Sequence, residues 1–352
     1  MYLQDNKLSE LARKIQKESV IIDAHSDLLF DVVRKRQMGR RKIIETDYLP
    51  SFIDGGINII VASLYIDDEF LPEMALRRAL QQISALYEEI DESFGKFVLC
   101  KNFQDIEQAL MKNQLGILIS FEGVEPLYND LSLLNIFYEL GVRILGLVWS
   151  RRNFSADGCH FNQIKIGTRG GLTDFGIKLI EKGNQLGMLV DVSHLNDKGF
   201  WDVIKFSKST IIASHSNCRA LASTMRNLTD QQIKAIAEKN GVIGINASNL
   251  LVADKPSDAT LEYMVKHVKH IIDLVGAEHV GLGLDLCDSL ISYLSPFTLK
   301  TMPFTPFDVL QGHKDLNKFI EAMLNIGLQE TQIRQILGQN FLRVLKSLSP
   351  DS

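Results

Sequence analysis

The 352-residue sequence lacks the features that mark membrane-spanning and secreted proteins. No apolar run approaches the roughly 20 residues that a transmembrane helix requires. The first residues, MYLQDNKLSELARKIQKESV, are charged and have no long apolar core, which is not typical of a signal peptide. The four cysteines form no CxxC pair, so neither a zinc knuckle nor a disulfide framework is expected: Cys100, Cys159, Cys218 and Cys287. These absences predict a cytoplasmic protein that does not bind membranes.

An excess of basic charge is missing as well. Lys and Arg number 38 against 43 Asp and Glu, which gives a net charge of −5 and argues against a nucleic-acid partner. The one basic stretch, Arg34 to Lys42, is open to two interpretations, a polyanion contact or a solvated loop, and the loop is favoured. No Pro/Ser-rich linker, internal repeat or low-complexity tract divides the chain, so one domain over residues 1–352 is expected.

Short apolar runs are what the sequence has in quantity. Eight of them are rich in Ile, Val and Leu with little alternation, as in parallel strands buried on both faces: Val20–Asp23, Ile57–Leu64, Gly116–Phe121, Ile144–Trp149, Met188–Val192, Thr210–Ser214, Val242–Asn246 and His279–Leu284. Segments of helical period lie between them, among them Glu73–Ile90, Leu172–Leu186 and Thr229–Lys239. This alternation predicts a (β/α)8 TIM barrel of the metal-dependent hydrolase type, with a doubly wound open sheet as the rival architecture.

The segments around this repeat complete the predicted architecture. The spacing of Leu8, Leu11, Ile15 and Val20 indicates a short amphipathic helix before the first strand. Two stretches after late strands are expected to be loops, Asn249–Ala259 and the proline-punctuated Leu286–Phe307. The tail returns to helical period and predicts two closing helices over Asp315–Leu345.

Polar residues follow the apolar runs where a metal site is expected. They stand in IIDAHSD, GILISFEG, MLVDVSH, TIIASHS and VGLGLD, each just past the carboxyl end of a predicted strand: His25, Asp27, Glu122, His194, His215 and Asp285. In a closed barrel all these ends meet on one face, where the active sites of such barrels lie. Residues far apart in the chain are therefore expected to converge.

The residue types indicate which chemistry this face supports. Three histidines and two carboxylates exceed the three protein ligands that one catalytic zinc needs, so two Zn²⁺ ions per chain are expected. A carboxylate can bridge two ions and an imidazole cannot, which assigns Glu122 to the bridge, His25 and Asp27 to one ion, and His194 and His215 to the other. Such a pair can hold a bridging hydroxide that attacks a carbonyl, with Asp285 carrying the proton.

Each residue alone also has a structural interpretation. A histidine at a strand end is more often a hydrogen-bonded structural residue, and an aspartate there often caps a helix. Five such coincidences favour a metal site. His160 is open to a substrate contact, and His267 and His270 are open to a contact with the metal ligands. A packing or surface role is the alternative for these histidines.

Taken together, these motifs resemble a known family. IIDAHSD, SFEG, VDVSH, ASHSN and GLGLD, with GGLTDFG, RNLTD and GQNFLRVL around them, make the chain similar to the membrane (renal-type) dipeptidases, a family of zinc peptidases, and to its bacterial-like subgroup. The resemblance runs from about Val20 to Leu345. It implies a binuclear zinc barrel that hydrolyses dipeptides, including those with a C-terminal D-residue, and related barrels often pair as homodimers.

The resemblance also assigns individual residues. It supports the same five metal ligands with Glu122 as the bridge, makes Asp285 the proton-shuttling aspartate, and makes Arg226 the group that grips the substrate carboxylate. One departure concerns Trp149, which stands where animal members carry a transition-state-stabilising histidine. Trp149 and Asn153 are therefore candidates for substrate contacts. The alternatives are a hydrolase of another small acylated or lactone substrate, or a non-peptidase member with a biosynthetic or binding role.

Overall fold

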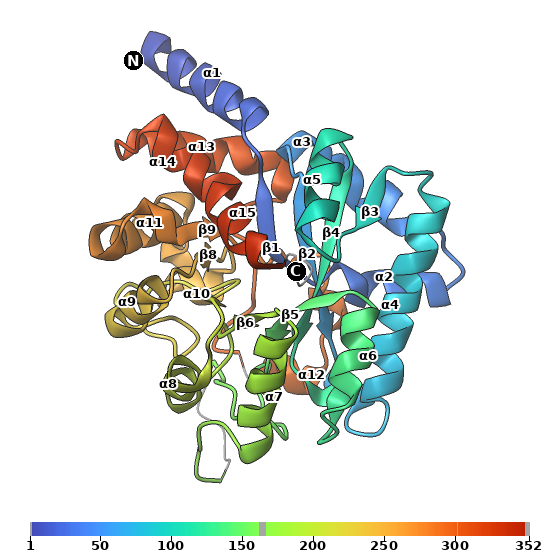
Figure 1. Cartoon of the computed structure of the whole chain (residues 1–352). Coiled ribbons are helices and arrows are strands. Elements are labelled where there is room, and N and C mark those ends of the chain that lie inside the picture. Colours follow the sequence, from blue (N-terminus) through green and yellow to red (C-terminus); the bar gives the residue numbers. More distant parts are fainter. Residues whose placement is uncertain (1, 162–166, 301, 349–352) are drawn as a thin grey trace.

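The computed structural model describes residues 2–161, 167–300 and 302–348 (Figure 1). Its sheet is parallel throughout, and eight strands follow one another in the order β7-β6-β5-β4-β2-β1-β9-β8. The strands are β1 (Ile22–Ser26), β2 (Ile59–Tyr65), β3 (Phe97–Leu99), β4 (Leu115–Glu122), β5 (Val142–Gly146), β6 (Leu189–Asp191), β7 (Ile211–Ile212), β8 (Ile243–Ile245) and β9 (Val280–Leu282).

The two ends of this strand order meet and close the barrel. Ala213, just past β7, forms a parallel bridge with Ile243 of β8. The Ala213 amide donates to Val242 O at 3.0 Å, and the Gly244 amide donates to Ala213 O at 2.8 Å. All eight predicted strands are confirmed, and the closure excludes the open sheet. The sequence analysis missed β3, which pairs with the first residues of β4 outside the ring.

Helices surround the ring, as Figure 1 shows. Their bounds are α1 (Tyr2–Glu18), α2 (Leu28–Gln37), α3 (Leu49–Gly55), α4 (Ala75–Glu92), α5 (Phe103–Met111), α6 (Leu133–Glu139), α7 (Asp174–Gln185), α8 (Asp197–Phe206), α9 (Asp230–Glu238), α10 (Asn249–Val252), α11 (Leu261–Val275), α12 (Pro296–Lys300), α13 (Leu316–Asn325), α14 (Glu330–Arg334) and α15 (Asn340–Leu345). The predicted amphipathic helix at the N-terminus is confirmed as α1, and α4, α7 and α9 confirm the three internal helices.

The predicted loops are more ordered than their composition indicated. Asn249–Ala259 begins with the short helix α10, because the Asn249 side chain binds Thr305 O and the Phe307 amide and ties the segment to the next insertion. The second insertion contains α12. Four or five helical residues are too few to show a period in the sequence. The tail forms α13 and a second helical stretch in which α14, a π-helical segment (Gln335–Gln339) and α15 follow one another without a break, so the two predicted closing helices are confirmed.

The core has two layers separated by the strands. Inside the barrel, Ile22, Ile59 and Leu118 pack with Phe341 and Val344 of α15. A Cβ at Gly281 would lie 2.3 Å from the Phe341 ring, so the glycine makes room for this helix to close the amino-terminal end of the barrel. Outside, a larger apolar cluster joins the strands to the surrounding helices. No helix in the described part of the chain is long and apolar enough to cross a membrane.

The basic stretch is largely neutralised by nearby acids. Arg34 pairs with Asp67 and Glu69, and Lys35 pairs with Asp31 and Asp47. Arg36 lies among three glutamates of α4, Glu88, Glu89 and Glu92. The first half of the stretch therefore belongs to α2 and is not a loop, and its charges are engaged within the fold.

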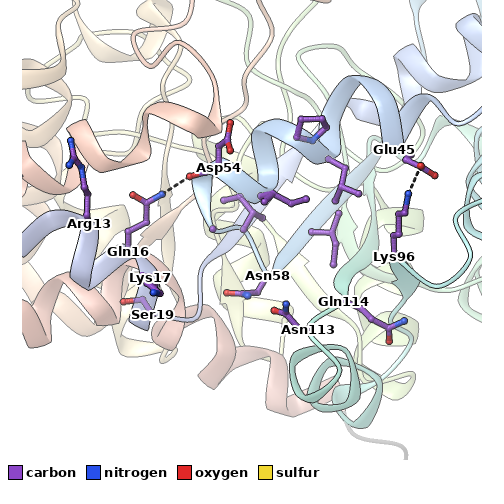
Figure 2. Close-up of a pocket in the computed structure, with 16 residues that line it drawn as sticks. Arg13, Gln16, Lys17, Ser19, Glu45, Asp54, Asn58, Lys96, Asn113 and Gln114 are labelled. Carbon is purple, nitrogen blue, oxygen red and sulfur yellow. Dashed lines mark hydrogen bonds and ion pairs between the residues drawn. The ribbon is translucent and has the colours of Figure 1, made fainter. Parts of the chain in front are cut away.

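A hollow of about 1070 Å³ lies at the amino-terminal end of the strands (Figure 2). It is lined by residues that precede or begin strands, such as Ser19, Asn58 and Leu115, and by Arg13 and Lys17 of α1. Its position is opposite the face on which the strands end, so it is separate from the candidate site described below.

Barrel closure generates a stability prediction. A Cβ at Gly244 would lie 1.9 Å from the carbonyl oxygen of Ser214, where β7 and β8 approach most closely. We expect Gly244→Ala to lower the free energy of unfolding by about 3 kcal/mol, because backbone atoms must shift to accept the methyl group. Urea unfolding measures this change. Gly170→Ala is the control, since its nearest atom would be 3.8 Å away. Equal stability of the two variants would contradict the close approach.

Candidate metal centre

A β-bulge in β1 aims the first two candidate ligands into the barrel. Asp23 pairs with Ile60 and Ser26 pairs with Ala62, so two residues of β1, Ala24 and His25, face the single residue between them on β2. Such a bulge re-aims the side chains that follow it. Asp27 then lies opposite Ser63, whose hydroxyl donates to Asp27 Oδ1. Although Asp27 immediately precedes α2, its side chain makes no capping hydrogen bond, so the capping interpretation does not hold.

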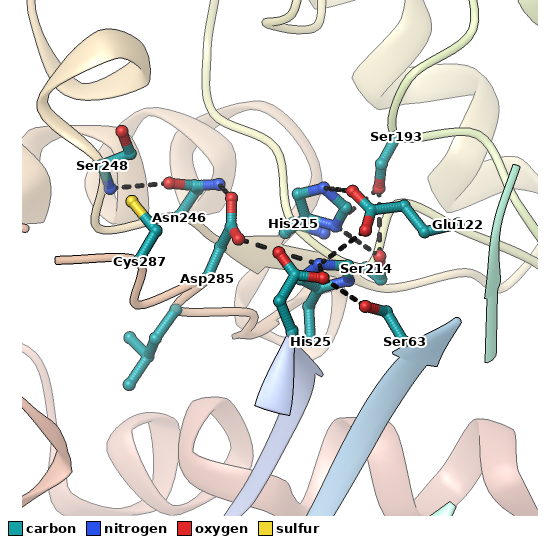
Figure 3. Close-up of polar contacts among 12 residues, drawn as sticks. His25, Ser63, Glu122, Ser193, Ser214, His215, Asn246, Ser248, Asp285 and Cys287 are labelled. Carbon is teal, nitrogen blue, oxygen red and sulfur yellow. Dashed lines mark hydrogen bonds and ion pairs between the residues drawn. The ribbon is translucent and has the colours of Figure 1, made fainter. Parts of the chain in front are cut away.

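The other five residues predicted from the strand ends converge on Glu122, the last residue of β4. Figure 3 shows Glu122 with His25, His215 and Asp285. Glu122 Oε1 lies 3.0 Å from His194 Nε2 and 3.8 Å from His215 Nε2, and Glu122 Oε2 lies 3.6 Å from His25 Nε2. On the far side, His25 Nε2 lies 3.7 Å from both Asp27 Oδ1 and Asp285 Oδ1. Two triads of donor atoms are compact enough to hold an ion, His25–Glu122–His215 and His25–Asp27–Asp285.

Buried hydrogen bonds orient the histidine rings. Ser214 Oγ donates to Asp191 Oδ2, which leaves the same hydroxyl to accept from Nδ1 of His215 at 2.7 Å. The network therefore assigns the ring proton to Nδ1 and leaves the Nε2 lone pair facing Glu122. His194 Nδ1 similarly pairs with Ser150 Oγ at 3.2 Å. Metal-binding histidines are held in this way, by a partner on the nitrogen that does not bind the ion.

The resulting arrangement fits a cation. The Nε2 atoms of His194 and His215 lie 2.9 Å apart, and both lie within 3.8 Å of Glu122 Oε1, so the two imidazoles and this carboxyl oxygen face one another. His25 Nε2 and Glu122 Oε2 are buried and have no hydrogen-bond partner among the described residues. Buried polar atoms without a partner are costly, and a bound divalent ion would satisfy both. The imidazole and carboxylate donors are those that zinc accepts.

Burial and mutual charge shift the pKa values of four of these groups. Burial, together with the neighbouring Arg226, holds the pKa of His194 well below its usual value, and burial does the same for His215. Both imidazoles are thus neutral, as metal ligands must be. Burial raises the pKa of Glu122 well above its usual range, and the nearby Asp27 adds to this. Burial opposes protonation of His25, but Glu122 and Asp27 outweigh it and raise that pKa to about 10.

Asp285 approaches the donors from the last strand of the ring. It follows β9 in the left-handed region, with φ of 52°, and Asn246 Nδ2 donates to its Oδ2 at 2.9 Å. Figure 3 shows Asp285 between Asn246 and the histidines. Burial raises its pKa to about 6, with a further contribution from Asp27 that His25 opposes. The carboxyl group is therefore placed beside the donor cluster, in a position to exchange a proton there.

Arg226 lies beneath the His194–His215 pair. Its guanidinium donates to the carbonyl oxygens of Ser193 and His215 and lies 3.3 Å from His194 Nε2. The side chain is 2% exposed, its Nε has no hydrogen-bond partner, and no carboxylate of the described residues forms an ion pair with it. Burial lowers its pKa. A buried cation without a counter-charge is unfavourable, so this position favours an anionic group on a ligand.

Trp149 and Asn153 lie in the loop that follows β5. The Trp149 ring centroid lies 6.0 Å from that of His194 and 5.3 Å from that of Tyr65, so the indole borders the donor cluster. Both ends of the Asn153 amide are used within the loop, because Nδ2 donates to Leu147 O and Oδ1 accepts from the amides of Ser155 and Ala156. We assign Asn153 to shaping the loop around Trp149.

Two of the remaining histidines, His267 and His270, have their own partners. His267 accepts from the Cys218 amide and donates to Val252 O, which is a packing role on α11, and His270 contacts Asp230 at the start of α9. The sequence did not predict the groups that support the donors, which are Ser63, Ser150, Asp191, Ser214 and Asn246. The available signal was that polar residues recur at every second position in DVSH and ASHS. Side chains at alternate positions of a strand face the same side, so this spacing indicates that these residues lie together.

Comparisons with known proteins place the chain in context. Residues 9–350 match the membrane dipeptidase family, Peptidase family M19. An uncharacterized protein in the pqqA 5′ region of Klebsiella pneumoniae is 35% identical over 272 residues, which cover 76% of this chain and 95% of that protein. Dipeptidase verJ of Clonostachys rogersoniana is 26% identical over 371 residues, covering 99% of this chain and 89% of that protein.

Solved structures show the same similarity. A crystal structure of a metallopeptidase from Rhodobacter sphaeroides, liganded with a phosphinate mimic of the dipeptide L-Ala-D-Ala, superposes with a TM-score of 0.81 at 26% identity. The match covers 94% of this chain and 99% of that chain. An amidohydrolase structure from Pseudomonas aeruginosa, at 20% identity and a TM-score of 0.76, shares the fold and covers 96% of this chain and 98% of that chain.

The orienting hydrogen bonds generate a prediction on metal affinity. We expect Ser214→Ala to weaken zinc binding by about 10- to 100-fold, because His215 loses the partner that fixes its ring and tautomer. Competition with a chromophoric chelator measures the affinity. Ser120→Ala is the matched control, since Ser120 lies on the same strand as Glu122 and its buried hydroxyl has no hydrogen-bond partner among the described residues. An unchanged affinity in Ser214→Ala would show that the hydroxyl does not support the centre.

Proposed function

The chain belongs to the membrane dipeptidase family (Peptidase family M19), and from this premise we propose that it is a binuclear zinc dipeptidase. The proposed reaction is hydrolysis of the amide bond of a dipeptide, including dipeptides with a C-terminal D-residue. The observation that carries the proposal is the convergence of His25, Glu122 and His215 with two buried, unpartnered donor atoms. The similar metallopeptidase that binds the L-Ala-D-Ala mimic supports the substrate class.

We propose that the donor set is shared between two ions. In the proposed centre Glu122 would bridge them, with His25 and Asp27 on one ion and His194 and His215 on the other. Bound ions of this kind supply a water activated at neutral pH and polarise the scissile carbonyl. Asp285 Oδ1 lies 3.7 Å from His25 Nε2, so its carboxyl group stands at the edge of the proposed centre.

The side chains then define how a substrate is oriented and how protons move. Arg226, buried and without a carboxylate partner, receives the C-terminal carboxylate. That contact places the amide bond over Glu122, with the N-terminal residue toward Asp27 and Asp285. Asp285 takes the proton of the attacking water at its Oδ atoms and delivers it to the leaving nitrogen, while Asn246 holds its orientation. Trp149 covers one side of the cluster and limits the access of bulk water.

Catalysis gives the first test. We expect the zinc-loaded protein to hydrolyse members of a panel of L-L and L-D dipeptides, and removal of zinc by a chelator to abolish turnover until zinc is returned. Asp285→Asn should lower kcat by about 100-fold or more while two zinc ions per chain are retained, since only proton transfer is removed. Amino-acid release is measured by chromatography and zinc by elemental analysis. Failure of the zinc-loaded protein to cleave any dipeptide would contradict a peptidase function.

A substitution of Arg226 distinguishes dipeptides, which carry a carboxylate, from the alternative lactone or ester substrates. We expect Arg226→Met to lower kcat/KM for a dipeptide at least about 30-fold, from the roughly 2 kcal/mol or more that a buried charge pair loses on truncation. The corresponding dipeptide amide, which has no carboxylate, should be cleaved equally by both proteins. Steady-state kinetics on the matched pair measure the difference. Equal losses on the two substrates would assign Arg226 a structural role instead.

A further inference from the structure

One buried carboxyl group outside the donor set connects the segments that carry His25 and Asp285. Asp23 lies in β1 on the face opposite the barrel interior and is fully buried. Its Oδ1 accepts from the amide of Leu284 at 2.9 Å and from the amide of His25 at 3.3 Å. Its Oδ2 accepts from Nε2 of His313 at 2.7 Å. Asp23 therefore binds the backbone of one candidate ligand and of the residue next to Asp285.

The strand ladder between β1 and β9 is short. β1 and β9 share a single register pair, Asp23 with Leu282. Beyond it β1 bulges at His25, and the chain after β9 turns into the left-handed conformation of Asp285. Neither the bulge nor the left-handed turn can continue a regular ladder. The Asp23 side chain therefore accepts from the amides of His25 and Leu284 in place of a backbone carbonyl. Its two bonds set the separation between the His25 and Asp285 segments.

His313 is itself held from outside the barrel. It begins a single helical turn, His313–Asp315, that packs against α3. Its ring meets Phe52 of α3 edge-on, with centroids 4.8 Å apart. A Cβ at Gly55 would lie 2.5 Å from His313 O, so the two backbones are in close contact there. The imidazole that orients Asp23 is thus fixed by the helix layer and not by the site.

We propose that Asp23 and His313 are positioning residues of the metal centre, which set the distance between the His25 imidazole and the Asp285 carboxyl group. This proposal rests on the proposed function for its catalytic consequence. Without His313 the Asp23 carboxyl group is free to turn, and the two buried amides lose their acceptor. The bulge then relaxes, and a displacement of about 1 Å in a catalytic group can cost on the order of 100-fold in rate.

The test compares His313→Leu with His313→Gln. We expect His313→Leu to weaken zinc binding to the chelator-stripped protein at least about tenfold, and to lower kcat at least about tenfold with KM nearly unchanged, because Arg226 lies across the barrel. In His313→Gln the side-chain amide can still donate to Asp23, so zinc affinity and kcat should largely return. His279→Leu is the matched control, since His279 bonds the carbonyl of Gly241 at the other end of the strands.

The outcomes separate positioning from stability. A His313→Leu protein with a lower Tm but wild-type zinc affinity and kcat would overturn the proposal, as would a His313→Gln variant that recovers neither. If His313→Leu does not fold, Asp23→Asn replaces it; this change keeps one acceptor for the amides and removes the acceptor for His313, and we expect the same direction of change. Zinc affinity alone tests the positioning role even if the wild-type protein cleaves no dipeptide, so this proposal and the proposed function fail separately.

Discussion

The structure depends on a set of buried imidazole and carboxyl groups crowded around Glu122. Two imidazole nitrogens lie 2.9 Å apart, and one carboxyl group touches both sides of the cluster. Inside a protein such an arrangement is unfavourable by itself, because burial removes the water that would otherwise solvate the groups and strengthens the repulsion of Glu122 by Asp27 and Asp285. The fold holds it in place, which is what pre-organisation for a metal requires.

The barrel provides this rigidity in two layers. Eight parallel strands bring their carboxyl ends to one face, and the donor set lies at the ends of four of them, β1, β4, β6 and β7, with Asp285 beside it after β9. Behind the donors, Asp191, Ser214 and Asn246 fix ring tautomers and carboxyl orientations through buried hydrogen bonds. Further out, Asp23 and His313 connect the first and last strands to the helix layer. Each layer restricts the next, so the position of His25 depends on groups that never contact a substrate.

The sequence predicted most of this arrangement, and its failures have identifiable causes. Runs of Ile and Val followed by His, Asp or Glu were sufficient to place the donors, since barrel geometry converts strand ends into neighbours. The bulge at His25 was not predictable, because an extra residue in one strand leaves the apolar run unchanged. β3 was missed since three residues carry no period. The hydrogen bonds of Asn153 within its loop were not predictable, because residue type alone cannot show that a loop already uses both ends of an amide.

The proposed function requires two metal ions that share Glu122, and one measurement tests directly whether they do. An anomalous difference map, collected at the zinc edge from crystals of the zinc-loaded protein, should show two peaks roughly 3.5–4 Å apart. Each should lie about 2.0–2.2 Å from an oxygen of Glu122, with His25 on one peak and His194 and His215 on the other. A single peak, or two peaks of which one does not touch Glu122, would contradict the bridged centre.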